Sequence, residues 1–316
     1  MIRTARQMKD LIRNMSRSTG VPQYVLIRRY MMERFLERLS LTRYRSAFVL
    51  KGGMLVSDMV GIGVRATMDI DATVKGLPLT VEAMKEVVDE IAAAEIGDNV
   101  HFRVKGIAPI MGDAEYGGIR VGLEALFDGS VTPLKLDIST GDAITPEAIR
   151  YGYRLMFEDR RIDILAYPIE TVLSEKLEAM VSRAETNTRM RDFYDMHILL
   201  RSYADKIDGE TLKKALKATS ERRGTGERLS DAEAVLSALE ASPRMEELWE
   251  SYQAKYNYAE GIAWAEVMRS ARALCVRAGV SAERPSIRAA LEQAKMEAAR
   301  QNGETQRTHR ERGYDR

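Results

Sequence analysis

The pattern of hydrophobic and polar positions divides the chain into a mixed part and a helical part. Across residues 22–40 hydrophobic residues recur every three or four positions, which predicts an amphipathic helix with arginines between the apolar positions. Two short apolar runs, at 47–50 and 68–74, predict strands. Between them residues 54–60 return to a helical pattern, so this part of the chain reads strand, helix, strand.

The pattern after residue 75 predicts one more helix and then several strands. Residues 79–95 are rich in helix formers, and Thr80 is a suitable N-cap. Alternating apolar and polar residues then predict strands over 101–110, 117–127, 132–142 and 161–165.

From Ile169 the pattern is helical, and Ser230 with Glu233 has the spacing of a capping box. The expected fold class is therefore α+β, with a mixed-sheet domain followed by a helical domain. We expect the first domain at 1–168, the second at 169–300, and a flexible tail at 301–316.

The amino-acid composition limits the kinds of structure and the cellular locations that the protein can have. Hydrophobic residues make up 45% of the 316, enough for a buried core. Cys275 is the only cysteine, which excludes an internal disulfide and a cysteine-rich zinc site. The sequence has neither a signal peptide nor an apolar run long enough to span a membrane. We therefore expect a cytoplasmic protein.

Charge is distributed unevenly along the chain. The whole chain has a net charge of +1, but residues 1–45 carry eleven basic and three acidic side chains. A basic N-terminal arm of this kind favours a polyanion such as RNA, although arginines can also line solvated helix faces. The eleven are Arg3, Arg6, Lys9, Arg13, Arg17, Arg28, Arg29, Arg34, Arg38, Arg43 and Arg45.

Acidic residues occur inside apolar strand patterns. Asp69 and Asp71 are two positions apart on one predicted strand, so both lie on the same face of it. Asp137 lies in another, between apolar neighbours. If the two strands are adjacent, three carboxylates converge, and they repel one another unless a cation lies between them. Mg²⁺ or Mn²⁺ would supply that cation and would bring a nucleoside triphosphate (NTP) with it.

Two glycines follow the first predicted strand. Gly52 and Gly53 come directly after Lys51, where the strand gives way to a helix. Glycines let the backbone approach a phosphate closely, and the free N–H groups of a helix N-terminus favour an anion. A simple glycine turn, with Asp69 and Asp71 as surface acids of an edge strand, is the alternative interpretation.

These motifs resemble a known family. The segments "LKGGMLVSDM" and "RATMDIDATV" resemble the signature of nucleotidyltransferases of the DNA polymerase β superfamily, and above all the AbiEii/AbiGii-type toxins. A second similar block, "PIETVLSEKLEAMVSRAETNTRMRDFYDMHIL", lies in the helical half, and the resemblance spans residues 48–199. It implies an N-terminal nucleotidyltransferase domain whose active-site cleft is completed by the helical domain.

The resemblance also implies roles for single residues. Asp69, Asp71 and Asp137 would be catalytic and would bind the metal ions, with Asp137 also a candidate general base. Gly52 and Gly53 would cradle the triphosphate. Many superfamily members have Gly-Ser at this place, so a hydroxyl is missing here.

In the helical half, Lys176 would contact phosphate and take part in catalysis. Asp192, or alternatively Asp195, would be the catalytic or orienting carboxylate, in a run that begins with Arg189 and Arg191. Without the family, the same charges read as an ion-paired helical surface. The expected nucleotide-binding residues are Lys51, Gly52, Gly53, Ser57, Thr67, Arg183 and Asp195.

The expected function is that of a toxin in a bacterial toxin–antitoxin system of the abortive-infection type, active in phage defence. It would transfer a nucleotidyl group from NTP to an acceptor hydroxyl, with tRNA as the acceptor, and a co-encoded antitoxin with a DNA-binding winged helix would be its partner. A small-molecule acceptor of the aminoglycoside kind, a protein acceptor, and a GTP- or ATP-binding module without transfer activity are the alternatives.

Overall fold

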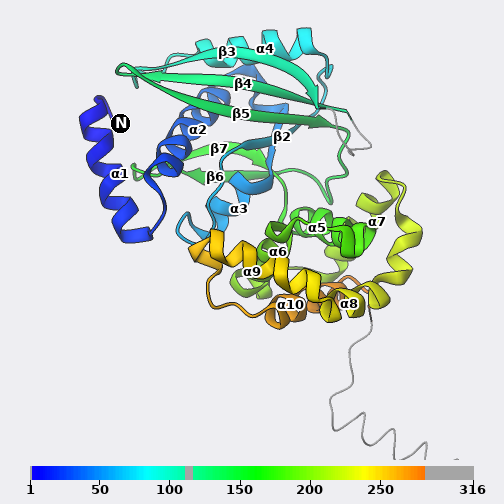
Figure 1. Cartoon of the computed structure of the whole chain (residues 1–316). Helices are drawn as coiled ribbons and strands as arrows, with labels where there is room; N and C mark the ends of the chain where they lie inside the picture. The colour runs from blue at the N-terminus through cyan, green and yellow to red at the C-terminus, as the bar shows by residue number, and fades with distance from the viewer. Residues whose placement is uncertain (1, 111–116, 282–316) are drawn as a thin grey trace, which may run out of the picture. The chain divides into compact units, whose positions relative to one another are not determined.

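The fold is built on a seven-stranded mixed sheet (Figure 1). The computed structural model describes residues 2–110 and 117–281. The strand order is β3-β4-β5-β2-β1-β7-β6, in which β2 is parallel to β5 and β1 to β7. The strands are β1 (Phe48–Lys51), β2 (Ile70–Val74), β3 (Val100–Ile110), β4 (Gly118–Phe127), β5 (Ser130–Thr140), β6 (Ile149–Arg154) and β7 (Arg161–Ala166).

Four helices belong to the mixed half of the chain and six to the helical half, within the described residues. The first four are α1 (Ala5–Thr19), α2 (Gln23–Leu41), α3 (Gly52–Val60) and α4 (Val81–Ala93). The others are α5 (Ile169–Arg183), α6 (Met190–Tyr203), α7 (Gly209–Arg222), α8 (Ala232–Ala241), α9 (Pro243–Lys255) and α10 (Trp264–Arg277).

The two faces of the sheet differ in chemistry. Apolar side chains of α2, among them Phe35, pack against Leu50, Ile70 and Leu136 on one face. Because side chains alternate along a strand, the residues next to these point to the opposite face. That opposite face carries the acidic residues and meets α3, which contacts α6 of the helical half.

The predicted α+β class is confirmed. Helix α4 begins after Thr80, whose side chain accepts a hydrogen bond from the Ala83 N–H, as expected of an N-cap. The structure adds β6, which the sequence pattern did not indicate. The strand with the two acids begins at Ile70, so Asp69 lies just before it.

The predicted capping box of α8 is wrong. The Ser230 hydroxyl donates instead to the carbonyl of Glu227, inside a short 3-10 helix that precedes α8. A serine hydroxyl can bond its own backbone a turn away, and here this local bond replaces the cap.

The helix predicted over 22–40 is confirmed as α2, but the exposure of its polar residues is not as expected. Arg29, Arg34 and Arg38 are all buried. Each is held by acids: Arg38 forms two hydrogen bonds with Asp98, at 2.7 and 3.0 Å, and Arg29 contacts Glu33 at 2.8 Å. These arginines are internal ion pairs and do not belong to a solvated basic face.

Residues up to Val280 form one compact unit. The proposed boundary near residue 168 therefore separates two parts of one unit and stays a prediction. The end of the predicted helical domain, 282–300, and the predicted tail, 301–316, lie outside the described residues. No described helix is both long and apolar enough to span a membrane.

Candidate active site

Four charged residues lie in one row across the polar face of the sheet. Lys51 on β1 is opposite Asp71 on β2, Asp71 is opposite Asp137 on β5, and Asp137 is opposite Arg120 on β4. Residues in register on neighbouring strands point to the same face. The expectation that strand 134–139 pairs beside the strand carrying Asp71 is therefore confirmed.

The outer acids of this group are each bonded to a cation. Arg120 makes two parallel hydrogen bonds to Asp137, both 2.8 Å long. The Nζ of Lys135 is 3.0 Å from Asp69 and 3.9 Å from Asp137. Arg120 could not be identified from the sequence, because only the β4–β5 register brings it to Asp137.

Asp71 is the acid at the centre. Burial raises the pKa of its carboxyl, and the nearby carboxylates of Asp137 and Asp69 raise it further, against the opposing effects of Lys51 and the Gly53 N–H. The Gly53 N–H donates to Asp71 at 3.3 Å. Asp71 is thus bonded directly to the first turn of α3 and is buried among charged neighbours of both signs.

Neighbouring side chains leave no room for a Cβ atom at either glycine of the turn. Gly52 has a φ of +65°, and a Cβ there would be 2.2 Å from an Asp71 oxygen. A Cβ on Gly53 would be 2.5 Å from the Thr67 Oγ1 and 3.2 Å from the Arg65 guanidinium. The side chains of Asp71, Thr67 and Arg65 therefore pack directly against the start of α3, which leaves room there for glycine and for no larger residue.

Thr67 and Ser57 differ in their relation to this turn. The Thr67 hydroxyl lies directly beside Gly53. Ser57 lies farther along α3, is 1% exposed, and its buried hydroxyl has no hydrogen-bond partner among the described residues. Of the two hydroxyls expected to bind nucleotide, that of Thr67 is beside the turn.

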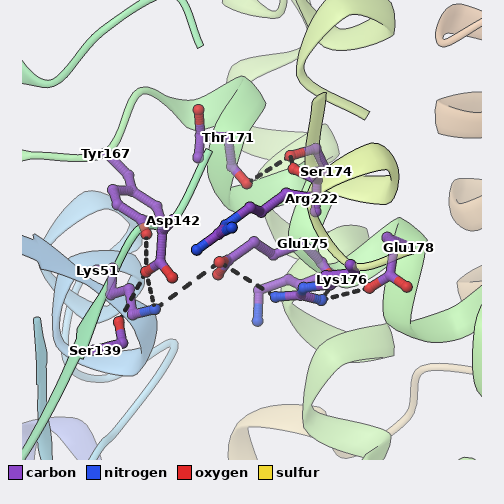
Figure 2. A network of polar contacts seen from close by, with 12 residues as sticks. Lys51, Ser139, Asp142, Tyr167, Thr171, Ser174, Glu175, Lys176, Glu178 and Arg222 are labelled. Atoms are coloured by element: carbon purple, nitrogen blue, oxygen red, sulfur yellow. Dashed lines mark hydrogen bonds and ion pairs between the residues drawn. The ribbon is translucent and has the colours of Figure 1, made fainter. Parts of the chain in front are cut away.

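Lys51 connects the sheet to the helical half (Figure 2). Its Nζ is 2.5 Å from Asp142 and 3.9 Å from Glu175 on α5. Asp142 also accepts hydrogen bonds from the hydroxyls of Ser139 and Tyr167, at 2.8 and 2.6 Å. Burial alone would raise the pKa of Asp142, but Lys51 and the two hydroxyls lower it on balance.

A second charged group, in the helical half, is buried. The Lys176 ammonium donates to Asp192 and Asp195, each at 2.8 Å. Asp195 also accepts from the Arg65 Nε at 2.6 Å, and Asp192 lies 2.8 Å from the Arg189 Nε. The two acids outweigh the effect of burial and raise the pKa of Lys176.

Arg65 joins this group to the turn at Gly52 and Gly53. It lies beside Gly53 and bonds Asp195 of α6, while the Tyr194 hydroxyl donates to the Val64 carbonyl at 2.5 Å. No periodic pattern in the sequence singles out Arg65, since it lies in a loop between α3 and β2. Arg183 lies at the end of α5 and is outside this group.

The described residues include no preformed cluster of three or more acids, histidines or cysteines able to hold a metal ion. Asp69 and Asp137 are turned to Lys135 and Arg120, as given above. Asp71 and Asp137 are nevertheless in register on adjacent strands, so two carboxylates, the kind of ligand that a hard divalent cation prefers, lie next to each other on one face of the sheet.

The comparison with protein families is decisive. The family model described as nucleotidyl transferase AbiEii toxin, type IV toxin–antitoxin system, matches residues 34–293, well over half of the chain. The chain belongs to the AbiEii family. It is therefore a nucleotidyltransferase of a toxin–antitoxin family, as the sequence motifs indicated. The family implies an NTP substrate and an antitoxin partner.

Solved structures with distant similarity to this AbiEii protein include three further chains. A proposed nucleotidyltransferase from H. pylori and JHP933 from Helicobacter pylori each share 19% identity and a TM-score of 0.45 with it. They cover 84% and 89% of this chain, and 100% and 99% of their own. An antigenic nucleotidyltransferase-like protein from Paracoccidioides brasiliensis has 13% identity, a TM-score of 0.37, and coverage of 66% and 92%. No curated protein matches the chain.

Proposed function

We propose that this AbiEii toxin transfers a nucleotidyl group from an NTP to a hydroxyl of tRNA and releases pyrophosphate. One observation carries the proposal: Asp71 and Asp137 are in register on adjacent strands, and Asp71 lies directly against the glycine turn at Gly52 and Gly53. Acids and a phosphate-binding turn are thereby brought to one place.

The roles of the residues follow from their positions. The first turn of α3 binds the triphosphate with its backbone N–H groups, and Thr67 adds a hydroxyl beside it. Lys176 is linked to this turn through Asp195 and Arg65, and balances phosphate charge. Lys51, opposite Asp71, is a second cation for the phosphates.

Asp69 and Asp71 would hold Mg²⁺ or Mn²⁺, with Asp137 as the third acid. When bound, such an ion neutralises charge on the phosphates and favours in-line displacement. In the transfer, the acceptor oxygen bonds the α-phosphorus, the bond to the β-phosphate bridging oxygen breaks, and pyrophosphate leaves. Asp137 would take the proton of the attacking hydroxyl, and Asp192, which accepts a hydrogen bond from Lys176, would orient that lysine.

The basic N-terminal segment supports an RNA acceptor, because the phosphate backbone is the common feature of any tRNA. As partner we propose a co-encoded antitoxin with a DNA-binding winged helix. The cytoplasm is the proposed site of action, and defence against phage the proposed outcome.

The test is incubation of purified protein with total tRNA, Mg²⁺ and, in turn, each of four α-labelled NTPs. We expect label on RNA with one or more NTPs, and at least about a hundredfold less with Asp69→Ala or Asp71→Ala, as for removal of a central electrostatic group. Asp163→Asn, which changes an exposed strand acid on β7, is the matched control and should keep full activity.

Label that persists in the Asp71→Ala variant would contradict the assigned site. Label found on a small molecule or a protein, and not on RNA, would show that the acceptor is not tRNA. The assignment of the active-site residues would then still stand. NTP binding without any transfer would favour a binding module.

A further inference from the structure

Helix α1 presents a basic face to solvent. Met8 and Ile12 are buried, α1 packs against α2, and the Ala5 N–H at its start donates to Asp128 in the turn between β4 and β5 (Figure 1). Positions three or four apart in a helix lie on one side, so the basic residues at 6, 9, 13 and 17 form a row along it. The exposed cations of this segment are Arg3, Arg6, Lys9, Arg13 and Arg17.

Little on α1 neutralises this row. Asp10 is the one acid of the helix, and its contact with Arg13, at 3.4 Å, is between side chains that are both more than half exposed. Exposed pairs of this kind contribute little. By contrast, Arg29, Arg34 and Arg38 of α2 are buried with their own acids, so much of the accessible positive charge of the N-terminal segment lies on α1.

The far end of α1 leads to the active site. A Cβ placed on Gly63 would contact the Thr19 side chain at 3.5 Å, so the last turn of α1 abuts the loop that follows α3. That loop continues through Arg65 and Thr67 to Asp69. A polyanion lying along α1 therefore reaches the segment that carries the candidate catalytic residues.

We propose that the row formed by Arg6, Lys9, Arg13 and Arg17 binds the sugar–phosphate backbone of a double-stranded stem of the acceptor RNA. The inference rests on the proposed function, since it takes the acceptor to be RNA. At 1.5 Å per residue the row extends about 16 Å, long enough to contact several successive phosphates. Four point charges over this length recognise backbone and shape, without reading sequence.

The test compares two variants with equal loss of charge. In the first, the four residues of the row become Gln, which keeps helix propensity. In the control, four exposed cations of the helical half become Gln. The control positions are Lys213, Lys214, Lys217 and Arg244.

Binding of fluorescent tRNA is measured by anisotropy between about 50 and 200 mM salt, with Asp71→Asn added to every protein so that no transfer occurs. We expect the α1 variant to bind at least about tenfold more weakly at low salt. The slope of log affinity against log salt should become shallower by about 3–4, at about 0.9 for each phosphate that the protein no longer neutralises. The control should follow the parent. Circular dichroism checks that the variants are equally helical.

The outcomes separate the two proposals. Equal losses of tRNA affinity in the two variants, or no loss in either, overturn the α1 inference. The proposed function still stands in that case if the parent protein binds RNA. If the parent neither binds tRNA nor labels it, both are overturned. If label transfer to tRNA persists in an α1 variant of the active protein at unchanged KM for tRNA, the inference fails alone.

Discussion

Asp195 should matter more for stability than any other acid of the candidate site. It is fully buried and bonds two cations from different parts of the fold, Arg65 from the loop before β2 and Lys176 from α5. Replacing it by Asn keeps the shape and removes the charge. Replacing it by Ala also leaves two buried cations short of a partner, which is the costly way to break a buried ion pair.

The magnitude follows from the charges. Burial opposes ionisation of Asp195, but Arg65 and Lys176 outweigh it and lower its pKa from 3.8 to about 2. A shift of that size corresponds to about 2–3 kcal/mol of unfolding free energy, which we expect Asp195→Asn to lose. For Asp195→Ala we expect about 3–5 kcal/mol. Because the pKa of Asp195 is depressed in the folded state, the contribution of its charge to the free energy of unfolding is complete above about pH 4. It disappears as the pH falls towards 2.

Urea unfolding at pH 7, followed by far-ultraviolet circular dichroism, measures the loss. At a slope near about 3 kcal/mol/M, Asp195→Asn should lower the midpoint by about 1 M. Asp192→Asn should lower it less, because one partner of Asp192, Arg189, is exposed and rehydrates easily. Asp205→Asn, an exposed acid of the helical half, is the control. An Asp195→Asn midpoint within roughly 0.2 M of the parent, which is about the error of the method, would refute the reasoning.

Three further predictions concern other parts of the chain. Gly52→Ala should cost about 2–4 kcal/mol of stability and abolish transfer, because its Cβ would overlap Asp71. Gly76→Ala, also at positive φ but in open space, should cost only about 1 kcal/mol. Equal losses of stability in urea titrations would contradict the contact between position 52 and Asp71. Burial raises the pKa of the Cys275 thiol to about 12, so iodoacetamide at pH 8 should label it only in urea; rapid labelling of native protein would disprove its burial. Burial also lowers the pKa of His197, so its contribution to the free energy of unfolding is complete above about pH 6.5 and decreases below it. His197→Gln should make the free energy of unfolding depend less on pH between about pH 6.5 and 5. An unchanged pH profile would show that His197 does not titrate in this range.

The acidic centre could be predicted because it depends on strand geometry. The proximity of Asp137 to Asp71 follows from a single assumption about strand pairing, which the structure confirms, whereas the same-face argument for Asp69 does not apply as stated because β2 begins only at Ile70. The glycine turn was likewise predictable, since a strand followed by two glycines and a helix has few conformations.

The supporting residues could not be predicted, because tertiary contacts alone place them. Arg65 and Asp142 lie in loops, and each bonds a partner more than ninety positions away in the sequence. Arg38 shows the opposite error: in sequence it belongs to a basic run, and in the fold it is internal. The net charge of a sequence segment does not distinguish an exposed arginine from one buried in an ion pair, since burial depends on what packs around the helix.

The contact between position 53 and Thr67 makes these two positions interdependent. A side chain at 53 would begin 2.5 Å from the Thr67 Oγ1, so the pair can have one side chain at this spot, from the helix or from the loop, but not two. Serine at 53, as in the Gly-Ser form of the signature, then requires Thr67 to change its rotamer or to be replaced by another residue. Substitutions at these two positions should therefore occur together in evolution.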